Sequence, residues 1–443
     1  MSAHSAPASG AATLLIVPEW HGQGGRRDLA ARADEAVGLA RAIALDVRHV
    51  HPLRLRQTRA ATLLGSGQVD ALKPVIEREQ VALVVVDAAL TAIQQRNLET
   101  AFETKVIDRT GLILEIFGER AATAEGRLQV ELAHLDYQAG RLVRSWTHLE
   151  RQRGGFGFLG GPGETQIEAD RRMIRDRMAR IRRQLDEARR TRGLQRGRRQ
   201  KAPWPVIALV GYTNAGKSTL FNMLTKSDVM AADMLFATLD PAMREIRLPQ
   251  IDKAILSDTV GFVSDLPTEL IAAFRATLEE VTTADLIVHV RDMSHPDAEA
   301  QYEDVRAILT SLGVTEEAGE GAVERVVPQL ELWNKIDLCD AEVRTVLEQR
   351  AETRDDVVIL SALTGEGVDA ARAALSARLT RDHQYREATL ASEQGDALAW
   401  LHAHGQVVGH RTTTAGEIVD ARLAPRDWDR FTALWPEVSV RPL

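Results

Sequence analysis

The chain has 443 residues, of which 44% are hydrophobic and 27% are charged, and its formal net charge is −8. This length exceeds what one hydrophobic core supports, so we expect two to four domains in an ordinary globular composition. A single cysteine, Cys339, excludes a disulfide framework within the chain. No apolar run reaches the roughly 18–20 residues that span a bilayer. We therefore expect a cytoplasmic protein without a signal peptide or a transmembrane segment.

The charge is unevenly distributed along the chain. Residues 171–201 carry 14 basic and three acidic side chains, a net charge of +11, which leaves −19 on the rest. A basic segment on an acidic protein favours a polyanionic partner that binds at one place. The alternative is an exposed arginine-rich helix that stabilises only itself.

Residues 13–117 alternate between strand-like and helix-like stretches. This alternation predicts a small N-terminal α/β domain, over residues 1–120, with a partly parallel sheet. The expected strands are short apolar runs, and the expected helices are longer and more polar. The strands cover 14–17, 81–87 and 105–107, and the helices cover 26–44 and 92–102.

Residues 121–192 predict an antiparallel helical hairpin. Its seams run from Leu128 to Leu149 and from Ile167 to Ala188, where seam residues recur at alternating spacings of four and three. Each arm is expected to be about 30 Å long. The tip between the arms, Gly154–Glu164, contains six glycines and two phenylalanines.

We expect this tip to contact RNA. Glycine lets a backbone approach another surface closely, and phenylalanine rings stack on bases. The alternative is a flexible connector with local contacts only. Residues 193–203 lack an apolar period and are interpreted as a linker. The expected RNA contacts are Gly155, Phe156, Phe158, Gly161 and Gly163.

A second α/β domain is expected over residues 204–381, beginning with a strand at 205–210. The strand leads into Gly211-Tyr212-Thr213-Asn214-Ala215-Gly216-Lys217-Ser218, which matches GxxxxGK[ST], and a helix follows from Thr219. In this context backbone N–H groups and the helix N-terminus bind phosphates. Lys217 would reach the β and γ oxygens, and Ser218 would ligate Mg²⁺.

Two further segments complete the expected phosphate and magnesium site. Asp258-Thr259-Val260-Gly261 follows a strand at 254–257, so Asp258 can hold Mg²⁺ through a water and the Gly261 amide can sense the γ-phosphate. Thr238, which follows Phe236 and Ala237 in a turn-prone stretch, is assigned to switch one and to Mg²⁺. The alternative for Thr238 is a turn or helix cap.

The base is expected to be guanine. Asn334-Lys335-Ile336-Asp337 follows a strand at 328–333, and Asp337 can accept two N–H bonds that adenine cannot supply. Ser361, Ala362 and Leu363 follow a strand at 357–360 and would close over the guanine edge. Four motifs in this order predict that GTP and GDP are the ligands. The catalytic residues would then be Lys217, Thr238 and Gly261.

Phe262 stands where Ras-like proteins carry a water-orienting glutamine. Phenylalanine cannot orient water, so intrinsic hydrolysis should be slow. Asn214 occupies the position at which several potassium-activated GTPases carry an asparagine ligand, which makes K⁺ a second expected cofactor. Asn214 has an alternative role, which is to brace the loop by hydrogen bonds. The last segment, 382–443, predicts a small α+β domain with a helix at 394–403, two strands and a helix from Arg426.

These motifs together resemble the HflX family of translational GTPases. The resemblance covers roughly residues 14–380 and is carried by six stretches. They are Val106–Leu114, Ser145–Arg151, Gly154–Phe158, Gly161–Arg172, Leu235–Pro241 and Asp258–Val263.

The resemblance implies a GTPase that docks on the large ribosomal subunit and its rRNA, with the hairpin tip reaching toward the peptidyl-transferase centre. In the GTP state such a protein splits stalled or stressed ribosomes, and we expect it to be a monomer. The residues alone leave two alternatives open. One is a GTPase of ribosome assembly or RNA modification, and the other is a GTP-binding regulatory scaffold that acts through a protein partner.

Overall fold

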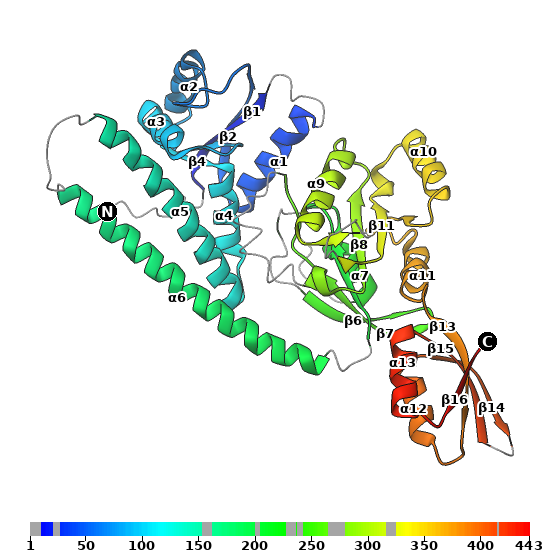
Figure 1. Ribbon diagram of the computed structural model, residues 1–443. Helices are drawn as coiled ribbons and strands as arrows, with labels where there is room; N and C mark the ends of the chain where they lie inside the picture. The colour runs from blue at the N-terminus through cyan, green and yellow to red at the C-terminus, as the bar shows by residue number, and fades with distance from the viewer. Residues whose placement is uncertain are drawn as a thin grey trace.

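The computed structural model describes residues 10–20, 27–152, 162–199, 204–226, 236, 242–264, 280–315, 325–413 and 416–443. In these ranges two larger parallel or mostly parallel sheets, one antiparallel sheet and a pair of long helices are arranged side by side, and a fourth sheet is a two-stranded parallel ladder (Figure 1). The protein is therefore an α/β protein in which further folded parts precede and follow the central sheet in the sequence.

The N-terminal sheet is parallel, and helices cover both of its faces. Along the first strand, Leu15 and Val17 face one buried cluster while Leu14 and Ile16 face another. The strand order is β2 (Asp46–Leu55), β1 (Ala12–Trp20), β3 (Leu83–Val86) and β4 (Lys105–Asp108). One face carries α1 (Leu29–Ala42) and α4 (Arg109–Arg120), and the other carries α2 (Ser66–Arg78) and α3 (Ala92–Phe102).

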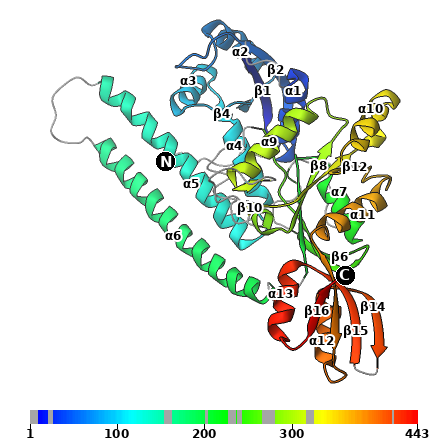
Figure 2. The same ribbon diagram turned by 45° about the vertical axis from the view of Figure 1, so that its right-hand side comes forward.

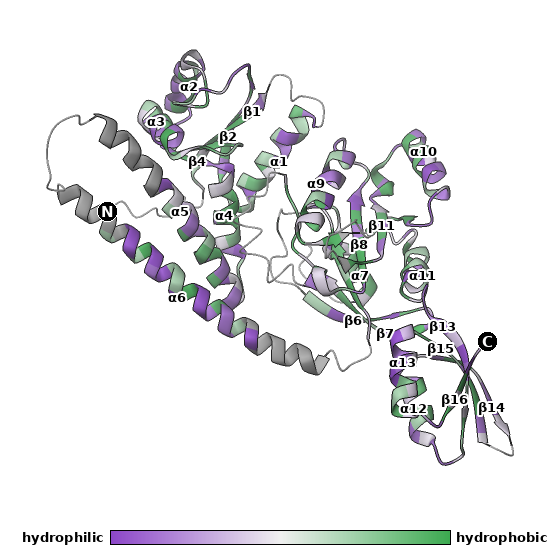
Figure 3. Ribbon diagram, in the orientation of Figure 1, coloured by the Kyte–Doolittle hydropathy of each residue, from purple (hydrophilic) through white to green (hydrophobic). Residues whose placement is uncertain are grey.

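The two long helices are α5 (Ala124–Gln152) and α6 (Pro162–Arg199), which lie side by side in both views (Figures 1 and 2). On α6 the seam positions Met178, Ile181 and Leu185 are buried. Apart from short hydrophobic bands, the described part of α6 is mostly hydrophilic (Figure 3). The expected seam is therefore buried at these α6 positions, whereas the described seam residues of α5, from Leu128 to Ala139, are half-buried.

Three details of the hairpin differ from the sequence-based expectation. With 29 and 38 residues, the helices are about 44 and 57 Å long at 1.5 Å per residue, rather than about 30 Å. Helix α6 begins at Pro162, a residue that suits the first helical turn, so the end of the expected tip is helical. It also continues to Arg199, so residues 193–199 are not an irregular linker. Arginine and glutamine there sustain a helix by propensity without an apolar face.

The central sheet has six strands, all parallel except for the β6–β7 pair. This arrangement brings the carboxyl ends of β5, β7, β8 and β11 to one edge, which is where ligands bind in open α/β sheets. The order is β12 (Val357–Ile359), β11 (Gln329–Asn334), β8 (Leu286–Asp292), β5 (Val206–Val210), β7 (Ile251–Asp258) and β6 (Ala242–Leu248).

Helices pack on both faces of this sheet (Figure 1). They are α7 (Lys217–Thr225), α9 (Ala298–Ser311), α10 (Ala341–Glu352) and α11 (Val368–Leu379), with a short 3₁₀ turn at Ile336–Leu338. A two-stranded ladder joins β9 (Val314–Thr315) to β10 (Arg325–Val326).

The C-terminal part is an antiparallel sheet with two helices on one face. Trp428 and Phe431 fill its core. Four strands are present where the sequence suggested two, because β13 and β16 are short or polar. The sheet order is β14 (Gln406–Thr413), β15 (Gly416–Leu423), β13 (Gln384–Leu390) and β16 (Ser439–Pro442), and the helices are α12 (Gly395–His404) and α13 (Pro425–Leu434).

The N-terminal and central parts share one buried cluster instead of having fully separate cores. It extends from Leu112 and Phe117 on α4 to Phe236, Phe262 and Val263 in the central part. The Phe117 and Phe236 rings meet edge to face, with centroids 4.6 Å apart. The two parts are therefore packed as neighbours with a dry contact between them. Among the described helices, none is both long and apolar enough to cross a membrane.

Candidate nucleotide-binding site

The loop between β5 and α7 has the shape that its glycines predict. At Gly211, φ is +150°, and a Cβ there would lie 2.2 Å from the Val290 carbonyl oxygen. At Gly216, φ is +94°, and a Cβ would lie 2.2 Å from Nδ2 of Asn334. Both positions exclude other residues, because a side chain would be strained and would collide with fixed atoms. The loop therefore turns tightly and leads into the N-terminus of α7.

Asn334 ties this loop to the opposite side of the site. Its side chain is buried, donates to the Ala215 carbonyl (2.8 Å) and accepts from the Ala362 amide (2.8 Å). The residue was expected near the base, and the structure shows it as a brace between the phosphate loop and the segment at 361–363. Three of the four sequence motifs thus meet at a single side chain.

Lys217 is the first residue of α7 and is almost fully buried. Its ammonium group donates to the carbonyl oxygens of Gly211 (3.1 Å) and Tyr212 (2.7 Å). Burial lowers the pKa of Lys217 to about 8, and the nearby Asp258 carboxylate only partly opposes this. A phosphate anion at this place would restore the charged form.

Oxygen donors suited to Mg²⁺ lie at the start of α7 and the end of β7. Ser218 Oγ donates to Oδ2 of Asp258 at 2.8 Å, and Asp258 is fully buried. Within the described ranges, the buried hydroxyl of Thr213 has no hydrogen-bond partner. A hydroxyl beside a carboxylate is a suitable donor set for a hard cation that keeps waters and phosphate ligands. The residues therefore fit Mg²⁺ bound together with a nucleotide.

The segment after β7 runs directly against the phosphate loop. The Thr213 amide donates to the Phe262 carbonyl (2.7 Å), and the Phe262 amide donates to the Gly211 carbonyl (3.1 Å). A Cβ on Gly261 would lie 3.0 Å from Nζ of Lys217. Phe262 itself is 1% exposed, so its ring belongs to the core and contributes nothing to water positioning.

The expected base-binding residues gather at the carboxyl ends of β11 and β12. Asp337 is exposed in the 3₁₀ turn, and Lys335 pairs with Asp292 at 2.7 Å. Ser361 and Ala362 are buried, whereas Leu363 is 75% exposed. An exposed carboxylate above a rigid loop can accept hydrogen bonds from a base that enters from solvent.

Several of the remaining predicted site residues are buried in the core. Thr259 and Val260 are buried in the core, where the Thr259 hydroxyl donates to the Leu209 carbonyl at 2.5 Å, so only their backbone faces the loop. The ring of Phe236 is taken up by its contact with Phe117. Thr219 lies on α7, Asn214 is exposed with φ of +60°, and Gly163 lies in the first turn of α6. Ala237, Thr238, Gly155, Phe156, Phe158 and Gly161 lie outside the described residues.

Sequence reasoning missed a polar network that joins the phosphate loop to the N-terminal sheet. The Tyr212 hydroxyl accepts from the Ser264 amide (2.7 Å) and donates to Glu35 (3.0 Å). Burial and the Glu35 carboxylate raise the pKa of Tyr212 to about 12, so the phenol stays neutral. Arg109 reaches Asp87, Glu35 and Ser264. Arg109 lies within the Val106–Leu114 stretch noted in the sequence, which was the one available signal.

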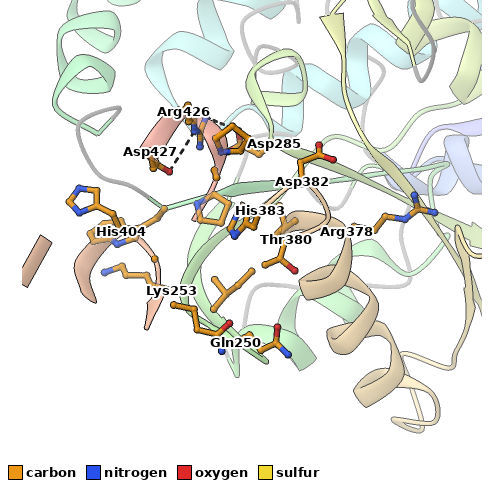
Figure 4. Close-up of a pocket in the computed structure, with 18 of the residues that line it drawn as sticks. Gln250, Lys253, Asp285, Arg378, Thr380, Asp382, His383, His404, Arg426 and Asp427 are labelled. Atoms are coloured by element: carbon orange, nitrogen blue, oxygen red, sulfur yellow. Dashed lines mark ion pairs between the residues drawn. The ribbon is translucent and has the colours of Figure 1, made fainter. Parts of the chain in front are cut away.

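A separate cavity of about 700 Å³ lies between the central and C-terminal sheets, away from all predicted site residues (Figure 4). Its lining includes Lys253, His383 and Arg426. Arg426 is paired with Asp285 (3.8 Å) and Asp427 (3.9 Å). Four aspartates in the lining outnumber its one lysine and two arginines, so the cavity has no excess of positive charge for a phosphate ligand.

Comparison with known proteins matches most of the chain to four family models. They are described as GTP-binding GTPase N-terminal (residues 30–118), GTP-binding GTPase Middle Region (120–199), 50S ribosome-binding GTPase (206–319) and HflX C-terminal domain (346–432).

The chain is also similar to curated proteins over most of its length. GTPase HflX of Magnetococcus marinus is 49% identical over 392 residues, which cover 88% of each chain. GTPase HflX of Escherichia coli K12 is 44% identical over 333 residues, which cover 75% of each chain. Among solved structures, a GTP-binding protein from Sulfolobus solfataricus in complex with GDP is 21% identical, with a TM-score of 0.43 over 84% of this chain and 99% of that chain.

The lowered pKa of Lys217 predicts that nucleotide binding depends on pH. Phosphates bind the protonated amine, so affinity should be full well below the pKa of about 8 and fall as pH rises through it, approaching about tenfold per pH unit above it. Titration with GDP between about pH 7 and 9 checks this expectation. In Lys217→Arg, whose guanidinium keeps its proton throughout, the profile should be flat. A wild-type profile as flat as that of the variant would contradict the prediction.

Asp337→Asn should shift nucleotide preference from GTP toward xanthosine triphosphate. The amide presents a donor where the carboxylate accepts, and xanthine offers an acceptor where guanine offers donors. Dissociation constants for the two nucleotides provide the measurement. Asp340→Asn is a matched control, because Asp340 caps α10 three residues away and asparagine caps equally well. Unchanged GTP preference in Asp337→Asn would remove Asp337 from the base pocket.

Proposed function

Because the chain belongs to the HflX family of GTPases, we propose that it binds the large ribosomal subunit and, in its GTP state, splits stalled or stressed ribosomes. As a member of this family the chain is a GTP hydrolase. The model that matches residues 206–319 is described as a 50S ribosome-binding GTPase, which supports the choice of partner. Splitting itself is the step that we add.

The geometry of the nucleotide site supports the GTP-bound state that the proposal requires. Its phosphate loop, its hydroxyl–carboxylate pair and its exposed Asp337 would hold Mg²⁺ and GTP. When bound, Mg²⁺ would neutralise phosphate charge that develops during hydrolysis. We assign Ser218, Asp258 and Thr238 to the metal, and Lys217 and Gly261 to the γ-phosphate. The Lys217 ammonium would exchange its present carbonyl partners for phosphate oxygens.

The surface of α6 supports the choice of a polyanion as partner. Along its described length the exposed arginines are Arg172, Arg175, Arg177, Arg180, Arg182, Arg183 and Arg190. Of these, Arg177 pairs with Glu131 of α5 at 2.7 Å. Arginines on one helix give salt-sensitive affinity for a phosphate backbone, and structured RNA offers such a surface.

The observation that carries the proposal is the attachment of this hairpin beside the nucleotide site. Asp108 accepts hydrogen bonds from Tyr137 (2.7 Å) and Arg141 (2.8 Å) of α5. The next residue, Arg109, bonds to Ser264 of the central domain. Two consecutive residues thus hold the hairpin and the segment that follows Gly261. A conformational change at the γ-phosphate can therefore be transmitted to the hairpin through very few residues.

We propose a division of labour that follows these attachments. Residues 1–120 would connect the other parts, 121–192 would carry the RNA-binding hairpin, and 204–381 would bind and hydrolyse GTP. Residues 382–443 would form an appended domain. The protein would work as a monomer in the cytoplasm, where ribosomes are its target.

Sedimentation of intact ribosomes with the protein and a non-hydrolysable GTP analogue tests the proposal. Splitting should appear as conversion of whole ribosomes into subunits with the analogue and not with GDP. Binding only to subunit precursors would favour an assembly GTPase instead. Normal GTP binding without any ribosome-stimulated hydrolysis would favour a regulatory scaffold.

Potassium should accelerate hydrolysis more than sodium at matched ionic strength. Asn214 is exposed at the entrance to the phosphate loop and makes no hydrogen bond within the described part of the chain, so its amide can ligate a cation. Asn214→Gly keeps the positive φ but removes the amide, and it should abolish the difference between the two salts. Equal wild-type rates in both salts would contradict the proposed ligand.

Replacing both Phe156 and Phe158 with alanine should abolish splitting but preserve GTP binding. The phosphate and base contacts all fall within 211–365, whereas these rings belong to the segment between α5 and α6. The variant should still sediment with large subunits through α6. Met173→Ala, an exposed apolar position on α6, is the matched control and should split normally. Normal splitting by the double variant would make this segment a connector only.

A further inference from the structure

We infer that Arg109 is a positioning residue for the nucleotide site, because it holds the main chain of Ser264 and thereby keeps the Gly261 amide in place for the γ-phosphate. This inference rests on the proposed GTPase function and names a residue outside the nucleotide motifs. Arg109 lies in the N-terminal domain, 155 positions before Ser264 in the sequence.

Every polar group of Ser264 is occupied by this network. Its carbonyl oxygen accepts from Nε (3.2 Å) and Nη2 (3.1 Å) of Arg109. Its hydroxyl accepts from the same Nη2 (2.7 Å) and donates to Glu35 (3.2 Å). Its amide donates to the Tyr212 hydroxyl (2.7 Å). A residue with all of these groups engaged in a buried place cannot shift without breaking several bonds.

The same network reaches the phosphate loop from the other side. Tyr212 belongs to that loop, and its hydroxyl also accepts from Arg27 at 3.2 Å. Arg27 in turn pairs with Asp304 on α9. Glu35 of α1 joins the two halves, because it bonds to Tyr212, Ser264 and Arg109. The phosphate loop and the segment after β7 are therefore fixed to one common set of side chains.

Gly261 stands three residues before Ser264, next to Lys217. Between them, the backbone of Phe262 is hydrogen-bonded on both sides to the phosphate loop. The bonds to Ser264 therefore hold the C-terminal end of the four-residue stretch that begins at Gly261. Gly261, at its N-terminal end, must meet the γ-phosphate. GDP has no γ-phosphate, so loss of this hold should weaken GTP binding and leave GDP binding unchanged.

Only arginine can make this contact. The planar guanidinium directs Nε and Nη2 to one carbonyl while Nη1 reaches Asp87. Lysine keeps the positive charge beside Asp87 and Glu35 but is a single point donor. Arg109→Lys therefore removes the two-pronged bond to Ser264 without leaving the buried carboxylates uncompensated, which Arg109→Ala would do.

Dissociation constants of fluorescent GDP and of a fluorescent non-hydrolysable GTP analogue, measured on the full chain with Mg²⁺, test the inference. In Arg109→Lys, affinity for the GTP analogue should fall about tenfold, equal to ~1.4 kcal/mol, with GDP affinity unchanged. The single-turnover rate of GTP hydrolysis should fall as well. Ser264→Ala retains the main-chain bonds and should lose less than Arg109→Lys.

Arg32→Lys is the matched control. Arg32 also pairs with Asp87 (3.3 Å), but within the described residues it donates to Pro18 and Asp87 and not to the central domain, so its GTP-to-GDP ratio should equal that of the wild type. If Arg109→Lys does not fold, Tyr212→Phe removes the acceptor of the Ser264 amide and should change the ratio in the same direction.

An unchanged ratio in Arg109→Lys, or an equal loss of both nucleotides, would overturn the inference. Equal loss would mean that Arg109 supports the folding of the loop as a whole. A wild-type protein that binds neither nucleotide would instead refute the proposed function. The two failures are therefore distinguishable in one set of titrations.

Discussion

A buried positive charge between two domains imposes the main constraint on this structure. Arg109 is 3% exposed, and burial alone would lower the pKa of its guanidinium, but Asp87 and Glu35 raise the pKa above its ordinary value. A buried ion of this kind persists only where partners satisfy it, and removing one partner typically destabilises a protein by about 3–5 kcal/mol. Because those partners come from the residue after β3, from α1 and from the central domain, their relative positions are fixed together.

This constraint explains why the N-terminal domain lies where it does. The carboxyl edge of a doubly wound sheet is ordinarily a ligand site. Here the buried Asp87 and Asp108 at that edge bind side chains of the protein instead. Asp87 pairs with Arg109, which bonds to the central domain, and Asp108 accepts hydrogen bonds from α5. The rings of Phe117 and Phe236 add an apolar contact between the two domains. The N-terminal domain therefore relates the nucleotide site to the hairpin.

Local patterns predicted much of the fold and the shape of the phosphate loop. Buried strands such as β1 could be predicted, and so could helix α3, because apolar runs and helical periodicity depend only on neighbouring residues in the sequence. The edge strand β2 was missed because His49, His51 and Arg54 interrupt its apolar residues. The phosphate loop was predictable because its geometry resides in eight consecutive residues. The contact of Arg109 with Ser264 was not, since no local spacing encodes a bond between residues 155 positions apart.

The bond between Arg109 and Ser264 has an evolutionary consequence. Two of its hydrogen bonds end on a main-chain oxygen, which every amino acid presents alike. A lineage can exchange the serine and retain both bonds, whereas any exchange of the arginine loses them. Substitutions should thus be tolerated at position 264 and eliminated by selection at position 109. Pairwise co-variation between the two positions would therefore be weak, although the residues are in direct contact.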